Sequence, residues 1–176
     1  MIAPTHCLPI AAQCRLNEAA ARAELALGIE LASDTRGTHP FVPVTAGGEV
    51  IGPPQFPTTL PTLDELIGLY PVTVHTVHRH VLALTEDAAR DHVYTLHAEL
   101  EGMKLRPVLE RLIAGWRAQG HTLVALGDLS RDRPAAPLPR HLIELGNVPG
   151  RGGRLAVQGQ CLAAAVDVQR ALDIPA

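Results

Sequence analysis

Residues 92–126 read HVYTLHAELEGMKLRPVLERLIAGWRAQGHTLVAL, and this stretch decides the expected fold class. Its middle part, residues 104–118, has apolar side chains on one helical face and charged side chains on the other. The apolar face consists of Leu105, Val108, Leu109, Leu112, Ile113 and Trp116. The flanking runs 92–97 and 122–126 are short and apolar, which is typical of buried strands. Strand, helix and strand in this order form a βαβ unit, so we expect an α/β fold with a parallel sheet.

The remaining elements are expected to be short, because proline and glycine punctuate most of the chain. We expect helices over 18–27, 63–68, 74–84 and 161–172, and a strand over 29–33. The segment 34–62 is expected to be mostly loop, and loops of that length inside a compact domain are often functional. The glycine-rich run 146–153 lacks the spacing of a phosphate-binding loop, so we expect a turn there.

Length and composition exclude several classes of protein. The chain has 176 residues with 47% hydrophobic and 19% charged residues, which allows one packed domain or a large part of one. A net charge of −3 without a cluster of basic residues argues against nucleic-acid binding. The three cysteines, at positions 7, 14 and 161, have no metal-binding spacing and indicate a reducing compartment. With no signal peptide and no membrane-spanning run, we expect a cytoplasmic protein.

A run of histidines at positions 75, 78 and 80 invites a metal site, but geometry argues against it. On a helix His75 and His78 lie about 60° apart, whereas His80 lies about 160° from His78. On a strand His78 and His80 share a face and His75 points away. The expected location of these histidines is therefore a solvated helix face, and we assign no metal ligand in this chain.

The better candidate for chemistry is His97, with Glu99 and Glu101 close behind it. His97 ends an expected strand, and catalytic groups gather at the carboxyl ends of parallel strands. A histidine there can act as a general acid or base near neutral pH. Two alternatives stay open from these residues alone: a structural or surface histidine, and an unrelated α/β enzyme that pairs His97 with either glutamate.

Several separated segments, taken together and in order, resemble the polysaccharide deacetylase (NodB-homology) family. They are RLNE at 15–18, ASDTRG at 32–37, TTLPTLDELIG at 58–68, YTLHAELEG at 94–102 and GNVPGR at 146–151. The resemblance spans residues 12–159. It implies a distorted (β/α) barrel that hydrolyses an N-formyl or N-acetyl group on an aminosugar, here undecaprenyl-phosphate-linked 4-formamido-arabinose in lipid A modification.

The resemblance also implies roles for individual residues. His97 matches a late histidine that protonates the departing amine, and Arg15 matches an arginine that orients the catalytic base. Asp34, Arg36, Glu99 and Glu101 lie in the matching segments and are expected to contact the substrate. In such enzymes a divalent metal held by an aspartate and two histidines activates water. The lipid-linked substrate implies peripheral contact with the inner membrane.

This sequence departs from the family pattern at its amino-terminal end. The family's aspartate-rich and H-[S/T]-x-x-H motifs lie upstream of the arginine motif, but only fourteen residues precede Arg15. We therefore expect an irregular segment over 1–11, the carboxyl-terminal part of a deacetylase-like domain over 12–159, and a helix or tail over 160–176. Without the metal-binding motifs, this chain alone is expected to be inactive and to bind no metal.

An alternative to a partial enzyme is a catalytically inactive remnant or truncated gene product. Such a chain would act at most as a sugar- or lipid-binding module. In either case strands that normally pair with a missing half would leave open sheet edges, so we expect self-association through those edges.

Overall fold

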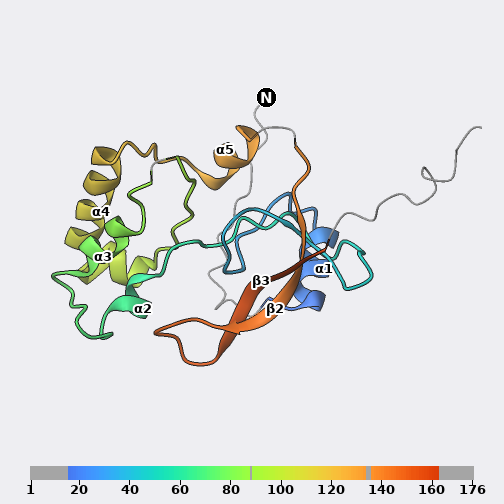
Figure 1. Cartoon of the computed structure of the whole chain (residues 1–176), viewed down its shortest axis with the longest axis horizontal. Coiled ribbons are helices and arrows are strands. Elements are labelled where there is room, and N and C mark those ends of the chain that lie inside the picture. Colours follow the sequence, from blue (N-terminus) through green and yellow to red (C-terminus); the bar gives the residue numbers. More distant parts are fainter. Residues whose placement is uncertain (1–15, 88, 134–135, 163–176) are drawn as a thin grey trace, which may run out of the picture.

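The computed structural model describes residues 16–87, 89–133 and 136–162. The described chain combines helices with a three-stranded sheet (Figure 1). The elements in chain order are α1 (Glu18–Ala26), β1 (Val42–Pro43), α2 (Leu63–Leu66), α3 (Val77–Ala83), the π-helix η1 (Leu100–Lys104), α4 (Arg106–Ala118), α5 (Leu126–Arg131), β2 (Arg140–Asn147) and β3 (Arg154–Leu162). Helices α2, α3 and α4 gather at one end, and the sheet with α1 lies at the other.

The expected helices over 18–27, 63–68, 74–84 and 104–118 are confirmed by α1 to α4, although α2 and α3 are shorter than expected. The Asn17 side chain accepts a hydrogen bond from the backbone of Ala20 at 2.9 Å and so caps α1. Helix α1 is followed by Gly28 with a φ of +73°, a conformation that glycine adopts without strain. These helices follow from local signals that need no distant partner.

The expected βαβ unit is wrong in its strands. Residues 92–97 and 122–126 form no strand, and α5 begins at Leu126. An apolar run becomes a strand only where a neighbouring backbone supplies the ladder of hydrogen bonds. The backbone oxygen of Val93 does accept hydrogen bonds from the backbone nitrogens of Thr59 and Leu60, at 3.0 and 3.4 Å, but the pairing does not continue along 92–97 as a ladder.

The sheet is instead built on a hairpin of β2 and β3, which was not predicted from the sequence. The predicted turn at 146–153 connects these two strands. Strands β2 and β3 are antiparallel, and the two residues of β1 pair with β2 in parallel. The expected start of a last helix at Cys161 is also wrong, because Cys161 pairs with His141 in this hairpin. The rest of that predicted helix, Arg15 and the segment 1–11 lie outside the described residues.

Isolated parallel bridges organise the long loop region. Ala32 pairs with Gln55, and Arg36 pairs with both Thr58 and Val157. The strand expected over 29–33 is thus reduced to the bridge at Ala32. These parallel contacts place the segment around Arg36 beside the one around Thr58 and against β3. A closed barrel stays a prediction.

The main hydrophobic core lies among α2, α3 and α4. It is built from Leu60, Leu63, Val77, Val81, Leu105, Val108, Leu112 and Trp116. Because Leu63 is fully buried in this core, α2 is fixed and its polar residues Asp64 and Glu65 have defined positions. Within the described ranges, no helix combines the length and the apolar character needed to cross a bilayer.

Candidate functional site

His97 lies beside an acidic side chain, Asp64, from a different segment of the chain. Its Nδ1 atom lies 3.6 Å from Oδ1 of Asp64, in the first turn of α2, and its side chain is 19% exposed. The Thr62 hydroxyl donates to Oδ1 of Asp64 at 2.6 Å, and Nη1 of Arg151 donates to Oδ2 at 2.9 Å. The Asp64 carboxylate is therefore held in place between the hairpin turn, the start of α2 and the imidazole.

The electrostatics of this contact favour an ionised Asp64. Partial burial alone would raise the pKa of the Asp64 carboxyl group, but the hydrogen bond from Thr62 and the charges of Arg151 and His97 outweigh it. The net result is a pKa below the usual aspartate range. Asp64 thus presents a negative charge to the ring of His97 at neutral pH.

The residue after Asp64, Glu65, lies in a buried ion-pair network that holds this part of α2 in place. Glu65 is fully buried and pairs with the guanidinium of Arg36, whose Nη1 atom also donates to the backbone oxygen of Leu60 at 2.7 Å. The Nε atom of Arg151 lies 3.2 Å from Glu65, and the other carboxylate oxygen of Glu65 accepts from the Thr62 backbone at 3.0 Å. A buried carboxylate needs such partners, since desolvation otherwise disfavours its charge.

Gly150 allows the hairpin turn to reach α2. Its φ is +81°, and an added Cβ would lie 1.9 Å from the backbone oxygen of Glu65. Only a residue without a side chain fits this approach. The glycine-rich run therefore serves to place the neighbouring Arg151 against Asp64 and Glu65.

Glu101 holds the other side of His97. It is completely buried in η1, and its carboxylate accepts from the Tyr94 hydroxyl and from the backbone nitrogen of His97, both at 2.9 Å. Burial, together with the charge and hydrogen bond of Glu101, raises the pKa of Tyr94 above its ordinary value, so the phenol stays protonated. The backbone position of His97 is thus fixed by a carboxylate four residues further along the chain.

The structure separates the predicted site residues into groups. His97, Arg36 and Glu101 belong to one connected network, but Arg36 and Glu101 are buried and bind protein atoms, so what the structure shows for them is a supporting role. Glu99 is exposed. Substrate contact by these residues stays a prediction, and Arg15 lies outside the described residues.

Asp34 belongs to a different contact, with Glu24 of α1. Burial and the neighbouring charge of Asp34 raise the pKa of Glu24 to about 7. Burial likewise raises the pKa of Asp34. Each of these two carboxyl groups is thus harder to ionise than a free one, and neither belongs to the His97 network.

Three residues of the network, Asp64, Glu65 and Arg151, were missed as site residues. Each lies inside a segment that carried the family resemblance, 58–68 or 146–151, so the segments were a usable signal. Nothing in the local sequence shows that these two distant segments meet, because the contact depends on the hairpin folding back onto α2.

No metal centre can be built from the described residues. Among 16–87, 89–133 and 136–162, no group of three or more His, Cys, Asp or Glu side chains is arranged to hold a metal ion. His78 and His80 lie on α3, and the exposed His75 precedes it. The divalent metal that the resemblance implies therefore does not fit the residues described.

No protein-family model matches the chain. It is similar to bacterial proteins described as probable 4-deoxy-4-formamido-L-arabinose-phosphoundecaprenol deformylase ArnD. The protein from Wigglesworthia glossinidia brevipalpis is 34% identical over 126 residues, which are 72% of this chain and 43% of the relative. The protein from Shewanella sediminis (strain HAW-EB3) is 32% identical over 110 residues, 62% of this chain and 34% of the relative. The chain thus spans less than half the length of these relatives, and similarity to a deformylase is established while membership of the wider polysaccharide deacetylase family stays a prediction.

Proposed function

We propose that this chain forms part of a carbohydrate N-deformylase that acts on an N-formyl aminosugar carried by a polyprenyl phosphate. The observation that carries the proposal is the contact of His97 with an Asp64 carboxylate that Thr62 and Arg151 hold in place. The similarity to relatives described as formamido-arabinose deformylases supplies the reaction and the substrate class.

The chemistry gives His97 a definite task. In the hydrolysis of a formamide, water adds to the formyl carbon, the C–N bond breaks, and formate leaves the sugar nitrogen. An amide nitrogen departs poorly unless it gains a proton as the bond breaks, and His97 would supply that proton. At 3.6 Å the Asp64 carboxylate lies beyond hydrogen-bond distance of Nδ1, so it would act on the imidazole through its negative charge. Its position beside Nδ1 would leave Nε2 of His97 for the substrate.

The water nucleophile is not assigned to any of the described residues. The family pattern places its activation on a metal, and the described residues do not bring a metal-ligand set together. We therefore limit the proposal to the proton donor and to its supports, Asp64, Arg151 and Glu101.

A chimeric enzyme tests the proposal directly. Residues 16–159 of this chain would replace the corresponding stretch of the Wigglesworthia relative, and formate release from the formamido-arabinose lipid would be measured. We expect an active chimera whose kcat falls about 100-fold or more with His97→Gln, the usual effect of losing a general acid.

The matched control is Asp128→Asn, because Asp128 is an exposed carboxylate of α5. It should leave formate release unchanged, whereas Asp64→Asn should lower it. Full activity of the His97→Gln chimera, with unchanged thermal stability, would remove His97 from the mechanism.

A further inference from the structure

The loop between α2 and α3 lies at one end of the molecule (Figure 1). It carries a group of exposed apolar side chains. Tyr70 is 98% exposed, Leu69 41% and Val74 39%. Isolated exposed apolar residues are ordinary, but three within six consecutive positions form a local patch. We refer to residues 68–75 as the tip.

Hydrogen bonds hold the tip in its outward conformation. The backbone nitrogen of Val72 donates to the oxygen of Leu69 at 2.6 Å, and that of Leu69 donates to Leu66 at 3.1 Å. Val72 packs against the main core, which anchors the base of the turn. The turn therefore presents Leu69 and Tyr70 to the exterior, although both could gain free energy by burial.

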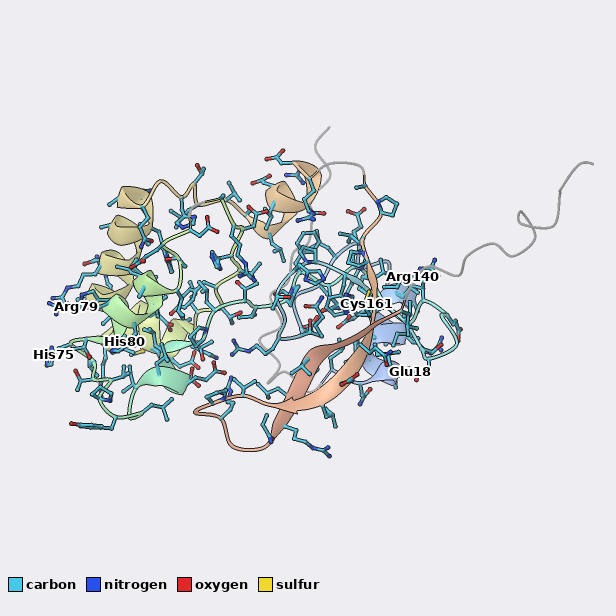
Figure 2. All side chains as sticks on the ribbon, viewed as in Figure 1. Glu18, His75, Arg79, His80, Arg140 and Cys161 are labelled. Atoms are coloured by element: carbon cyan, nitrogen blue, oxygen red, sulfur yellow. The ribbon has the colours of Figure 1, made fainter. Side chains whose placement is uncertain are left out.

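The charge around the tip has one sign. Residues 66–85 contain no aspartate or glutamate, but they include Arg79 and three histidines. His75, Arg79 and His80 are exposed, and Figure 2 shows them together at the end of the molecule that holds α3. Segments that lie in a membrane interface typically combine tyrosine, aliphatic and basic side chains, and the tip with the neighbouring part of α3 has this combination.

The tip also adjoins the candidate site. Helix α2 carries Asp64, which contacts His97, and the chain enters the tip two residues after α2 ends at Leu66. Helix α2 and the two residues after it therefore connect the candidate site to the tip along the chain.

We propose that the tip docks this protein on an anionic lipid surface, with Leu69 and Tyr70 entering the interface and Arg79 facing lipid phosphates. The delivery of a lipid-linked sugar to His97 rests on the proposed function. The docking itself depends only on the tip.

Sedimentation of the full 176-residue chain with lipid vesicles tests the docking. The vesicles would contain phosphatidylcholine alone or phosphatidylcholine mixed with phosphatidylglycerol. We expect the wild-type chain to bind the anionic vesicles more tightly. The double variant Leu69→Ser/Tyr70→Ser should lower that partitioning about tenfold. Arg79→Gln should lower it about fivefold on anionic vesicles only.

Matched controls lie at the other end of the molecule. Leu27→Ser removes a side chain that is 78% exposed and directly follows α1, which lies at that end (Figure 1). Arg140→Gln removes a base at the same end (Figure 2). Neither should change vesicle binding. The substituted tip residues are exposed, so thermal stability should match the wild-type value.

Each outcome separates this inference from the proposed function. Vesicle binding that is absent in the wild-type chain, or that is unaffected by the tip variants, overturns the docking. Loss of self-association in the tip variants, without any vesicle binding, assigns the tip to a protein contact and also overturns it. Vesicle binding that depends on the tip supports the docking even if the chimera releases no formate, a result that would contradict only the proposed function.

Discussion

At the scale of single residues, three carboxylates determine the geometry around His97. Asp64 is partly exposed and ionised, Glu65 is buried between two arginines, and Glu101 is buried beneath His97. The sequence predicted His97 and Glu101 because both sit in one conspicuous segment. It did not predict which carboxylate would face the imidazole, since that depends on a contact between residues 33 positions apart, His97 and Asp64.

Removing the buried carboxylate of Glu65 should destabilise the fold. Glu65→Gln leaves the guanidinium of Arg36 buried without an ionic partner, which typically costs about 3–5 kcal/mol. Urea unfolding should show a clearly lower midpoint. Glu110→Gln, which breaks an exposed ion pair with Arg106 on α4, should leave the midpoint nearly unchanged. Equal midpoints for the two variants would contradict a stabilising role for the buried network.

Glu24 should make stability depend on pH. Its pKa is about 7 in the folded state, against an ordinary value of 4.5, so the folded chain binds the proton more tightly than the unfolded chain. This contribution to the free energy of unfolding is complete below about pH 4.5 and is lost as the pH rises through about 7.

Urea titrations across that pH range, on the wild-type chain and on Glu24→Gln, would measure the effect. The variant should show a smaller decline in the free energy of unfolding, and Glu30→Gln on the nearby exposed loop should decline like the wild type. An identical decline in Glu24→Gln would show that the Glu24 and Asp34 pair does not control it.

At the scale of elements, helices α1 to α4 were predictable, whereas α5, η1 and the strands were not. Helices α1 and α4 follow from a capping residue and an apolar stripe, signals that act within one segment. The β2 and β3 hairpin depends on pairing between two segments that are each weakly patterned. The apolar run at 122–126 lacks a pairing partner, and Leu123 and Val124 stay exposed.

The hairpin turn offers a matched pair of glycine substitutions. Gly150 and Gly153 both have positive φ values, +81° and +84°, but only Gly150 faces a close neighbour, the backbone of α2. Gly153→Ala should lower the free energy of unfolding by roughly 1–2 kcal/mol, the cost of that conformation alone. Gly150→Ala should cost more and should move Arg151 away from Asp64, which thermal unfolding and NMR shifts at His97 would detect. Equal effects of both substitutions would contradict a tight contact between turn and helix.

At the scale of the whole molecule, a group of exposed apolar side chains lies beside α4. Leu96, Leu123 and Val124 are 48%, 45% and 51% exposed and line a cavity of about 730 Å³ beside α4. The sequence predicted self-association through open sheet edges, which stays a prediction. These three residues belong to no strand, so they form a separate candidate surface for association. A closed barrel needs strands that pair around a full circle, and the sheet in the described residues has three strands, so the barrel stays a prediction.

We predict concentration-dependent association through this surface. Light scattering coupled to size-exclusion chromatography should show a rising mass for the wild-type chain as its concentration increases. Leu123→Ser/Val124→Ser should remain monomeric over the same range, because it removes apolar area without touching the core. A wild-type chain that is monomeric throughout would contradict the prediction.

The central claim is that His97 donates the proton that releases the sugar amine. The most direct measurement compares two substrates in the chimera, the formamido sugar and the activated ester p-nitrophenyl formate, whose leaving group departs without a proton. With His97→Gln, we predict that hydrolysis of the formamide falls about 100-fold or more while hydrolysis of the ester falls far less. An equal loss for both substrates, or no loss for the formamide, would contradict the assignment of His97 as the proton donor.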